Sequence, residues 1–114
     1  MVRIYHNPRC SKSRATLQLL IDHGIQPEVI EYLDQPPDAA TLRDVLAKLG
    51  LEARQLLRRG EPEYRDLDLA DESLAPDRLI QAMVHHPRLI ERPIVVSDKG
   101  ARIGRPPESI LEIL

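Results

Sequence analysis

The stretch that decides the fold is Tyr5-His6-Asn7-Pro8-Arg9-Cys10-Ser11-Lys12-Ser13-Arg14. A short apolar run at residues 2–5 predicts a β-strand, and the amphipathic run that begins near Ser11 predicts an α-helix. Cys10 therefore lies at a strand-to-helix turn, with its sulfur near the helix N-terminus. The unpaired backbone N–H groups and the positive end of the helix dipole at this place favour a thiolate over a thiol.

The basic neighbours of Cys10 also favour the thiolate form. Arg9, Lys12 and Arg14 all lie within four residues of it, and nearby positive charge lowers the pKa of a thiol. The ordinary alternative for a lone cysteine is a buried and inert side chain. The basic neighbours favour a reactive nucleophile instead.

Length and composition limit the classes of protein that remain. The chain has 114 residues, a net charge of −2 and a single cysteine. We expect one domain over residues 1–114, no nucleic acid as a partner, no internal disulfide and a cytoplasmic location. No apolar run is long enough for a membrane span, and no secretory leader is visible. Phe and Trp are absent, so the core must be aliphatic.

Periodicity predicts a βαβ unit followed by helices. The first helix should end near Gly24, with Leu17, Leu20 and Ile21 on one face, and residues 27–33 should hold the second strand. After the break at residues 36–37, we expect a helix that ends at Gly50, a short helix at 53–59, a loop or broken helix at 61–73, and a helix from Pro76 to Pro87.

The last third of the sequence predicts a hairpin and a final helix. Residues 94–96 and 101–103 read as strands joined by a turn, and a helix with Ile110, Leu111 and Leu114 should start at Pro106 or Pro107. The predicted fold class is α/β, with a four-stranded βαβ–ββα frame. The helices between the second and third strands form an insertion.

The motifs then identify a family resemblance that spans nearly the whole chain. The Cys10 stretch resembles that of the ArsC family of glutaredoxin-coupled arsenate reductases, whose fold is a thioredoxin-like mixed sheet. The similarity continues through Tyr32-Leu33, Pro36-Pro37, Leu56-Leu57-Arg58-Arg59, Asp77-Arg78-Leu79-Ile80, His86-Pro87, Arg92-Pro93-Ile94-Val95-Val96 and Gly104-Arg105-Pro106. Plasmid-borne members continue beyond the last motif, whereas this chain, like the short chromosomal members, stops at Leu114.

The resemblance implies roles for particular residues. Cys10 would be the nucleophile, and Arg58, Arg92 and Arg105 would bind the oxyanion, with Arg59 as the alternative to Arg58. Pro93 would follow a cis peptide bond and face the cysteine. Asn7 and Arg14 belong to the cysteine motif and would support it. His6 is either a polar residue at the strand end or a group that helps to set the pKa of Cys10. Ser13 either bonds within the first helical turn or donates to the thiolate.

The reaction implied is reduction of arsenate to arsenite by covalent catalysis. Because the chain has no second cysteine, glutathione would act as co-substrate and glutaredoxin or free glutathione would supply the last thiol. No cofactor or metal is expected to bind. The thioredoxin-coupled type needs further cysteines, and a Cys-x5-Arg phosphatase-like loop would need an arginine where Thr16 stands.

Two other readings of the sequence stay open. One is a glutathione-dependent thiol reductase that acts on a substrate other than arsenate. The other is a non-catalytic regulatory binding module of the same fold. Such modules typically carry Cys-x-x-Cys as a redox switch, and Ser13 stands at the fourth position here.

Overall fold

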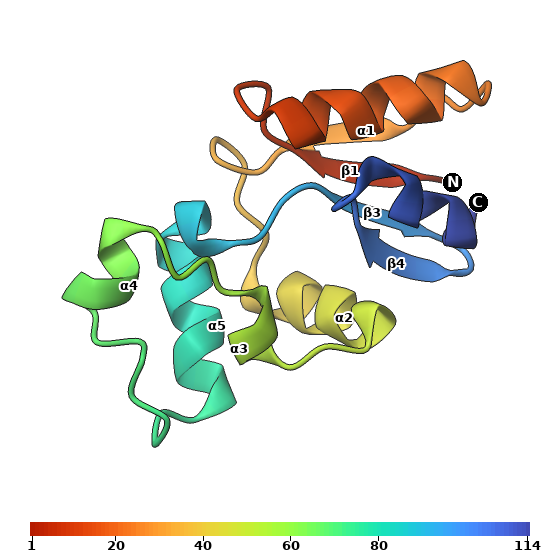
Figure 1. Ribbon diagram of the computed structural model, residues 1–114. Helices are drawn as coiled ribbons and strands as arrows, with labels where there is room; N and C mark the ends of the chain where they lie inside the picture. Colours follow the sequence, from red (N-terminus) through yellow and green to blue (C-terminus); the bar gives the residue numbers. More distant parts are fainter. The chain divides into compact units, whose positions relative to one another are not determined.

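The computed structural model describes residues 1–114 and divides into two compact units (Figure 1). Met1–Gln35 and Arg92–Leu114 form one, which we call the sheet unit, and Pro36–Glu91 forms the other, the helical unit. The helical unit is the insertion that the sequence predicts between the second and third strands. The expectation of one domain over residues 1–114 stays a prediction.

The sheet unit confirms the predicted mixed sheet of four strands. The strands are β1 (Arg3–His6), β2 (Glu28–Glu31), β3 (Ile94–Ser97) and β4 (Gly100–Ile103), in the order β2-β1-β3-β4. β1 and β2 are parallel and are connected by α1 (Ser11–Asp22), whereas β3 pairs antiparallel with both β1 and β4. The C-terminal end of β1, in the centre of the sheet, leads directly into the Cys10 turn.

The core of the sheet unit joins β1 and β3 to two helical segments. Ile4 lies opposite Val95 in the β1–β3 register, so both side chains project from the same face of the sheet. They pack with Leu20 of α1 and with Ile110 and Ile113 of η2 (Pro107–Ile113). These five side chains are all aliphatic, but the expectation of an aliphatic core is wrong for the unit as a whole, because the aromatic side chains of Tyr5 and Tyr32 are also buried in it.

The final helix differs from the prediction, because η2 is a 3-10 helix and not an α-helix. A 3-10 helix has three residues per turn, which places Ile110 and Ile113 on one face. Both are buried, whereas Leu111 is 40% exposed. The α-helical period instead places Ile110, Leu111 and Leu114 on one face, which is why the prediction included Leu111.

The buried face of α1 is more polar than predicted. Its buried residues are Ser13, Thr16 and Leu20, and Ile21, which we placed on the apolar face, is 51% exposed. A buried hydroxyl is tolerated where it forms hydrogen bonds, and Thr16 Oγ1 donates to the Lys12 carbonyl at 2.8 Å.

The helical unit consists of short helices whose ends follow clear sequence signals. They are α2 (Ala39–Leu49), α3 (Ala53–Leu56), α4 (Pro62–Asp66), α5 (Pro76–His85) and the 3-10 turn η1 (Pro87–Leu89). Asp38 caps α2 by accepting the Thr41 N–H at 2.8 Å, and Gly50 ends it with a φ of 70°. α5 packs against α2 and α3, and the buried apolar side chains of these three helices are Leu42, Val45, Leu46, Ala53, Leu56, Leu79, Ile80 and Met83.

The segment with Arg58 is the main local difference in the helical unit. α3 ends at Leu56, so Arg58 does not lie in a helix as predicted. Leu57 instead forms an antiparallel bridge with Ile90, and the Arg58 N–H donates to the Leu89 carbonyl at 2.8 Å. Residues 61–73 hold α4 and turns, and of the two predicted forms, a loop or a broken helix, the broken helix is confirmed. None of the helices has the length and apolar character needed to cross a membrane.

Candidate functional site

Cys10 is the N-cap residue of α1, as the sequence predicts. Its N–H donates to the Asn7 carbonyl and its own carbonyl accepts the Arg14 N–H, both at 3.0 Å. The Asn7 side chain accepts the Arg9 N–H at 3.0 Å, and Arg14 Nη1 donates to the Pro8 carbonyl at 3.0 Å. These bonds fix the turn on both sides of the cysteine, so Asn7 and Arg14 support the loop itself.

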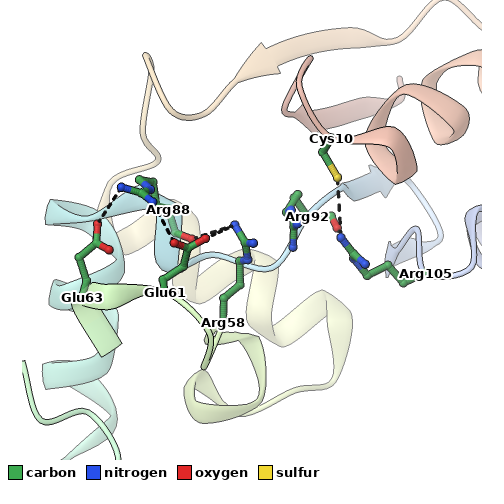
Figure 2. Close-up of polar contacts among 7 residues, drawn as sticks. All are labelled: Cys10, Arg58, Glu61, Glu63, Arg88, Arg92 and Arg105. Atoms are coloured by element: carbon green, nitrogen blue, oxygen red, sulfur yellow. Dashed lines mark hydrogen bonds and ion pairs between the residues drawn. The ribbon is translucent and has the colours of Figure 1, made fainter. Parts of the chain in front are cut away.

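Arg105 brings a guanidinium group to the sulfur. Its Nη2 lies 3.7 Å from Cys10 Sγ, and its Nε donates to the Arg92 carbonyl at 2.8 Å (Figure 2). Arg92 precedes β3 and Arg105 follows β4, so the β3–β4 hairpin carries both arginines to the end of β1. Three of the predicted site residues therefore meet within the sheet unit.

The pKa of the Cys10 thiol lies below its ordinary value. Burial is the largest single influence and works in the opposite direction. It is outweighed by the Ser13 amide, the Arg92 guanidinium, the Lys12 amide and the Arg105 guanidinium together. The Ser13 and Lys12 amides act on the sulfur as hydrogen-bond donors, although neither bond has the geometry of a regular side-chain cap. The result is a partly buried sulfur whose thiolate form is favoured.

The source of the positive charge differs from the prediction. Arg9, Lys12 and Arg14 have exposed side chains, and none of these side chains is among the groups that lower the pKa of Cys10. The predicted source is therefore wrong, because Arg9 precedes the helix and the side chains of Lys12 and Arg14 lie on the exposed side of its first turn, whereas Ser13 is on the buried side. Residues from the distant hairpin supply the charge instead.

Ser13 and His6 form a buried pair behind the cysteine. Ser13 Oγ is completely buried, lies 2.6 Å from His6 Nδ1 and accepts the Asn7 N–H at 3.0 Å. Burial lowers the pKa of His6, opposed by Glu31 and assisted by Arg14. The His6 tautomer decides the direction of this bond: Ser13 donates to Nδ1 when the ring proton is on Nε2, and Nδ1–H donates to Ser13 Oγ when it is on Nδ1. The Ser13 side chain thus bonds to His6 and Asn7, and only its backbone amide faces the sulfur.

The backbone around Arg105 is fixed by a close approach at Gly104. The Gly104 N–H donates to the Pro93 carbonyl at 2.9 Å. A Cβ at Gly104 would lie 2.8 Å from Pro93 Cγ and closer still to Thr16 Oγ1. Gly104 and Thr16 therefore position Arg105, a role that the sequence interpretation missed, although Gly104 is part of the Gly104-Arg105-Pro106 motif. The Arg92–Pro93 bond is cis, as predicted, and so is Arg105–Pro106.

Arg58 lies in the helical unit and pairs with a carboxylate there. Its Nη1 lies 2.9 Å from Glu61 Oε1, and Arg88 Nη2 lies 3.0 Å from Glu61 Oε2 (Figure 2). Arg59, the alternative, is exposed. The prediction that Arg58 acts at Cys10 stays a prediction. Nowhere do three His, Cys, Asp or Glu side chains gather so that they could hold a metal ion.

Comparison with known proteins places these residues in a family context. The sequence model of the ArsC family matches residues 5–113. The uncharacterized protein YfgD of Escherichia coli strain K12 is 61% identical, with 99% of this chain and 96% of YfgD aligned. An arsenate reductase of Neisseria meningitidis is 48% identical over 99% of this chain and 97% of its own length. The solved structure of an arsenate reductase from Vibrio cholerae is 54% identical, with a TM-score of 0.97 and 99% and 97% coverage.

Proposed function

Because this chain belongs to the ArsC family, we propose that it reduces arsenate to arsenite with Cys10 as the nucleophile and glutathione as the thiol donor. One observation carries the proposal: the sulfur with a lowered pKa lies 3.7 Å from Arg105 Nη2 at the start of α1. Relatives that are named arsenate reductases match nearly the whole chain, which supports arsenate as the substrate.

Arsenate suits the charge around Cys10. It is a tetrahedral oxyanion that carries about two negative charges near neutral pH, as phosphate does. The guanidinium groups of Arg92 and Arg105 stay charged and present planar sets of N–H donors. The N-terminus of α1 adds backbone donors that point at the same place. In our proposal, Arg58 is the third guanidinium that binds the anion.

The chemistry begins with attack of the Cys10 thiolate on arsenic. A sulfur–arsenic bond forms, and one arsenate oxygen leaves as water after taking up protons. Glutathione then attacks the Cys10–arsenic adduct. The two sulfur atoms join, two electrons pass to arsenic, and arsenite leaves, so that Cys10 is left as a mixed disulfide with glutathione.

A thiol that does not belong to this chain must complete the catalytic cycle. Cys10 is the only cysteine, so no residue of the protein can reduce the mixed disulfide. The thiol of glutaredoxin or of a second glutathione attacks the glutathione sulfur and restores the Cys10 thiolate. We place the protein in the cytoplasm, where the glutathione pool keeps such a cysteine reduced.

The buried pair of His6 and Ser13 contributes indirectly. His6 lies against the Ser13 hydroxyl at 2.6 Å, and it is not among the groups that lower the pKa of Cys10. We assign the pair the task of holding the first turn of α1, so that the Ser13 amide points at the sulfur. Pro93, together with Gly104, holds the backbone of the two arginines.

Turnover with defined thiol donors tests the proposal. We expect steady arsenate reduction with glutathione, glutaredoxin and glutathione reductase, and none with the C10S variant. Thioredoxin with its reductase, supplied alone, should not support turnover. Arsenate reduction by C10S, or equal turnover with thioredoxin alone, would contradict the mechanism. Reduction of a glutathionylated peptide without any arsenate reduction would favour the thiol-reductase alternative.

A further inference from the structure

Four charged side chains of the helical unit form a network around one carboxylate, which we call the Glu61 network (Figure 2). Glu61 contacts two guanidinium groups, with Oε1 2.9 Å from Arg58 Nη1 and Oε2 3.0 Å from Arg88 Nη2. Glu63 completes the network, with Oε2 3.9 Å from Arg88 Nη1. The Glu61 side chain is 13% exposed and that of Arg58 is 23% exposed, whereas Arg88 is 58% exposed. The pair of Arg58 and Glu61 is therefore the better shielded part of the network.

The contacts of Arg58 restrict one edge of its guanidinium group. Its backbone N–H donates to the Leu89 carbonyl at 2.8 Å, next to the Leu57–Ile90 bridge. Nη1 bonds to Glu61 and lies 3.4 Å from the Arg88 carbonyl. Within the helical unit, no hydrogen bond engages Nε or Nη2. This second edge offers two parallel N–H groups, the arrangement that binds two oxygens of an oxyanion at once.

We propose that Glu61 is a positioning residue for Arg58: its carboxylate holds Nη1 so that the Nε–Nη2 edge is presented to an oxyanion ligand. This inference rests on the proposed function, because it takes Arg58 as a ligand of arsenate. A carboxylate beside Arg58 can change the affinity for an anion in either of two opposite ways. A carboxylate that competes with the anion would weaken binding, whereas one that orients the guanidinium would strengthen it.

The geometry favours orientation over competition. Glu61 divides its charge between two arginines, and its contact with Arg58 is through Nη1, which is not one of the two nitrogens of the Nε–Nη2 edge. An anion can therefore bind the free edge without breaking the ion pair. Without Glu61, the long side chain would have to be ordered by the anion itself, which reduces affinity.

The test compares E61Q with E63Q. Both variants replace a glutamate of the same segment by its neutral isostere, and both glutamates contact Arg88, but only Glu61 contacts Arg58. We expect E61Q to raise the KM for arsenate about tenfold, the loss of one charge-assisted hydrogen bond, with little change in kcat. E63Q should keep the wild-type KM. In an R58Q background, E61Q should have no further effect. Circular dichroism confirms that each variant is folded at the assay temperature.

Arsenate binding measured by calorimetry on the C10S variant separates this proposal from the proposed function. Weaker binding in C10S/E61Q than in C10S/E63Q supports the role of Glu61 even if the wild-type protein does not turn over. Turnover with an unchanged KM in E61Q overturns the role of Glu61 and leaves the proposed function intact. A lower KM in E61Q, equal effects of E61Q and E63Q, or an undiminished effect of E61Q in R58Q would also overturn it.

Discussion

Replacement of Ser13 by alanine separates what holds the Cys10 turn from what activates the sulfur. The substitution removes a fully buried hydroxyl that lies 2.6 Å from His6 Nδ1 and accepts the Asn7 N–H at 3.0 Å. It keeps the backbone amide of residue 13, which is the part that faces Cys10. We therefore expect a large loss of stability with little change in the pKa of the thiol.

The size of this stability loss follows from the polar groups that S13A leaves without a hydrogen-bond partner. A buried polar group without a partner costs about 1–3 kcal/mol. His6 is 6% exposed, so its Nδ1 bears this penalty, whereas Asn7 is only partly buried and water can replace part of its bond. The unfolding free energy of S13A should thus fall by roughly 2–4 kcal/mol. Urea unfolding, followed by circular dichroism, measures the loss.

A matched control and a second readout make this prediction refutable. S11A changes an exposed serine of the same helical turn and should alter the unfolding free energy by less than about 0.5 kcal/mol. The rate of Cys10 alkylation against pH reports the pKa of the thiol in each variant. Equal stability of S13A and S11A would refute the structural role. A thiol pKa restored to its ordinary value in S13A would show that the hydroxyl acts on the sulfur.

Three further predictions follow from the site. G104A should reduce the unfolding free energy by about 1–3 kcal/mol and also slow arsenate reduction, because its Cβ meets Pro93 and Thr16. The double variant G104A/T16A should recover part of both losses. If it recovers neither, the steric explanation is wrong. R105K keeps the charge but loses the hydrogen bond from Nε to the Arg92 carbonyl, so kcat/KM should fall about tenfold or more with the unfolding free energy unchanged. The control R102K alters the exposed Arg102–Glu112 pair and should keep full activity. Because the pKa of His6 is lowered below its ordinary value of 6.5, the unfolded chain binds more protons below that pH, and the unfolding free energy should fall as pH drops through this window; an equal pH dependence in H6N would contradict the assignment.

The parts of the fold that local patterns encode were predictable from the sequence. Gly24 and Gly50 end their helices with positive φ, and the Cys10 turn joins β1 to α1 as the change in periodicity indicates. The stripe of Leu42, Val45 and Leu46 is the buried face of α2. In each case the signal lies within one element or at its boundary.

The parts that depend on tertiary contacts were not predictable. The 3-10 form of η2 and the burial of Ser13 and Thr16 follow from packing between α1, η2 and the sheet. The positive charge at Cys10 comes from Arg92 and Arg105, far along the chain, and not from its neighbours. Glu61 carries no motif of its own, and only the distances to Arg58 and Arg88 draw attention to it.

A single-turnover mixture without glutaredoxin tests the central claim most directly. Wild-type protein is mixed with arsenate and glutathione, quenched with acid, and analysed by mass spectrometry of the intact chain and of its Cys10 peptide. We predict one glutathione on Cys10 for each arsenite released, and no modification when arsenate is omitted. Arsenite release with Cys10 unmodified, or equal glutathionylation of Cys10 without arsenate, would contradict the account.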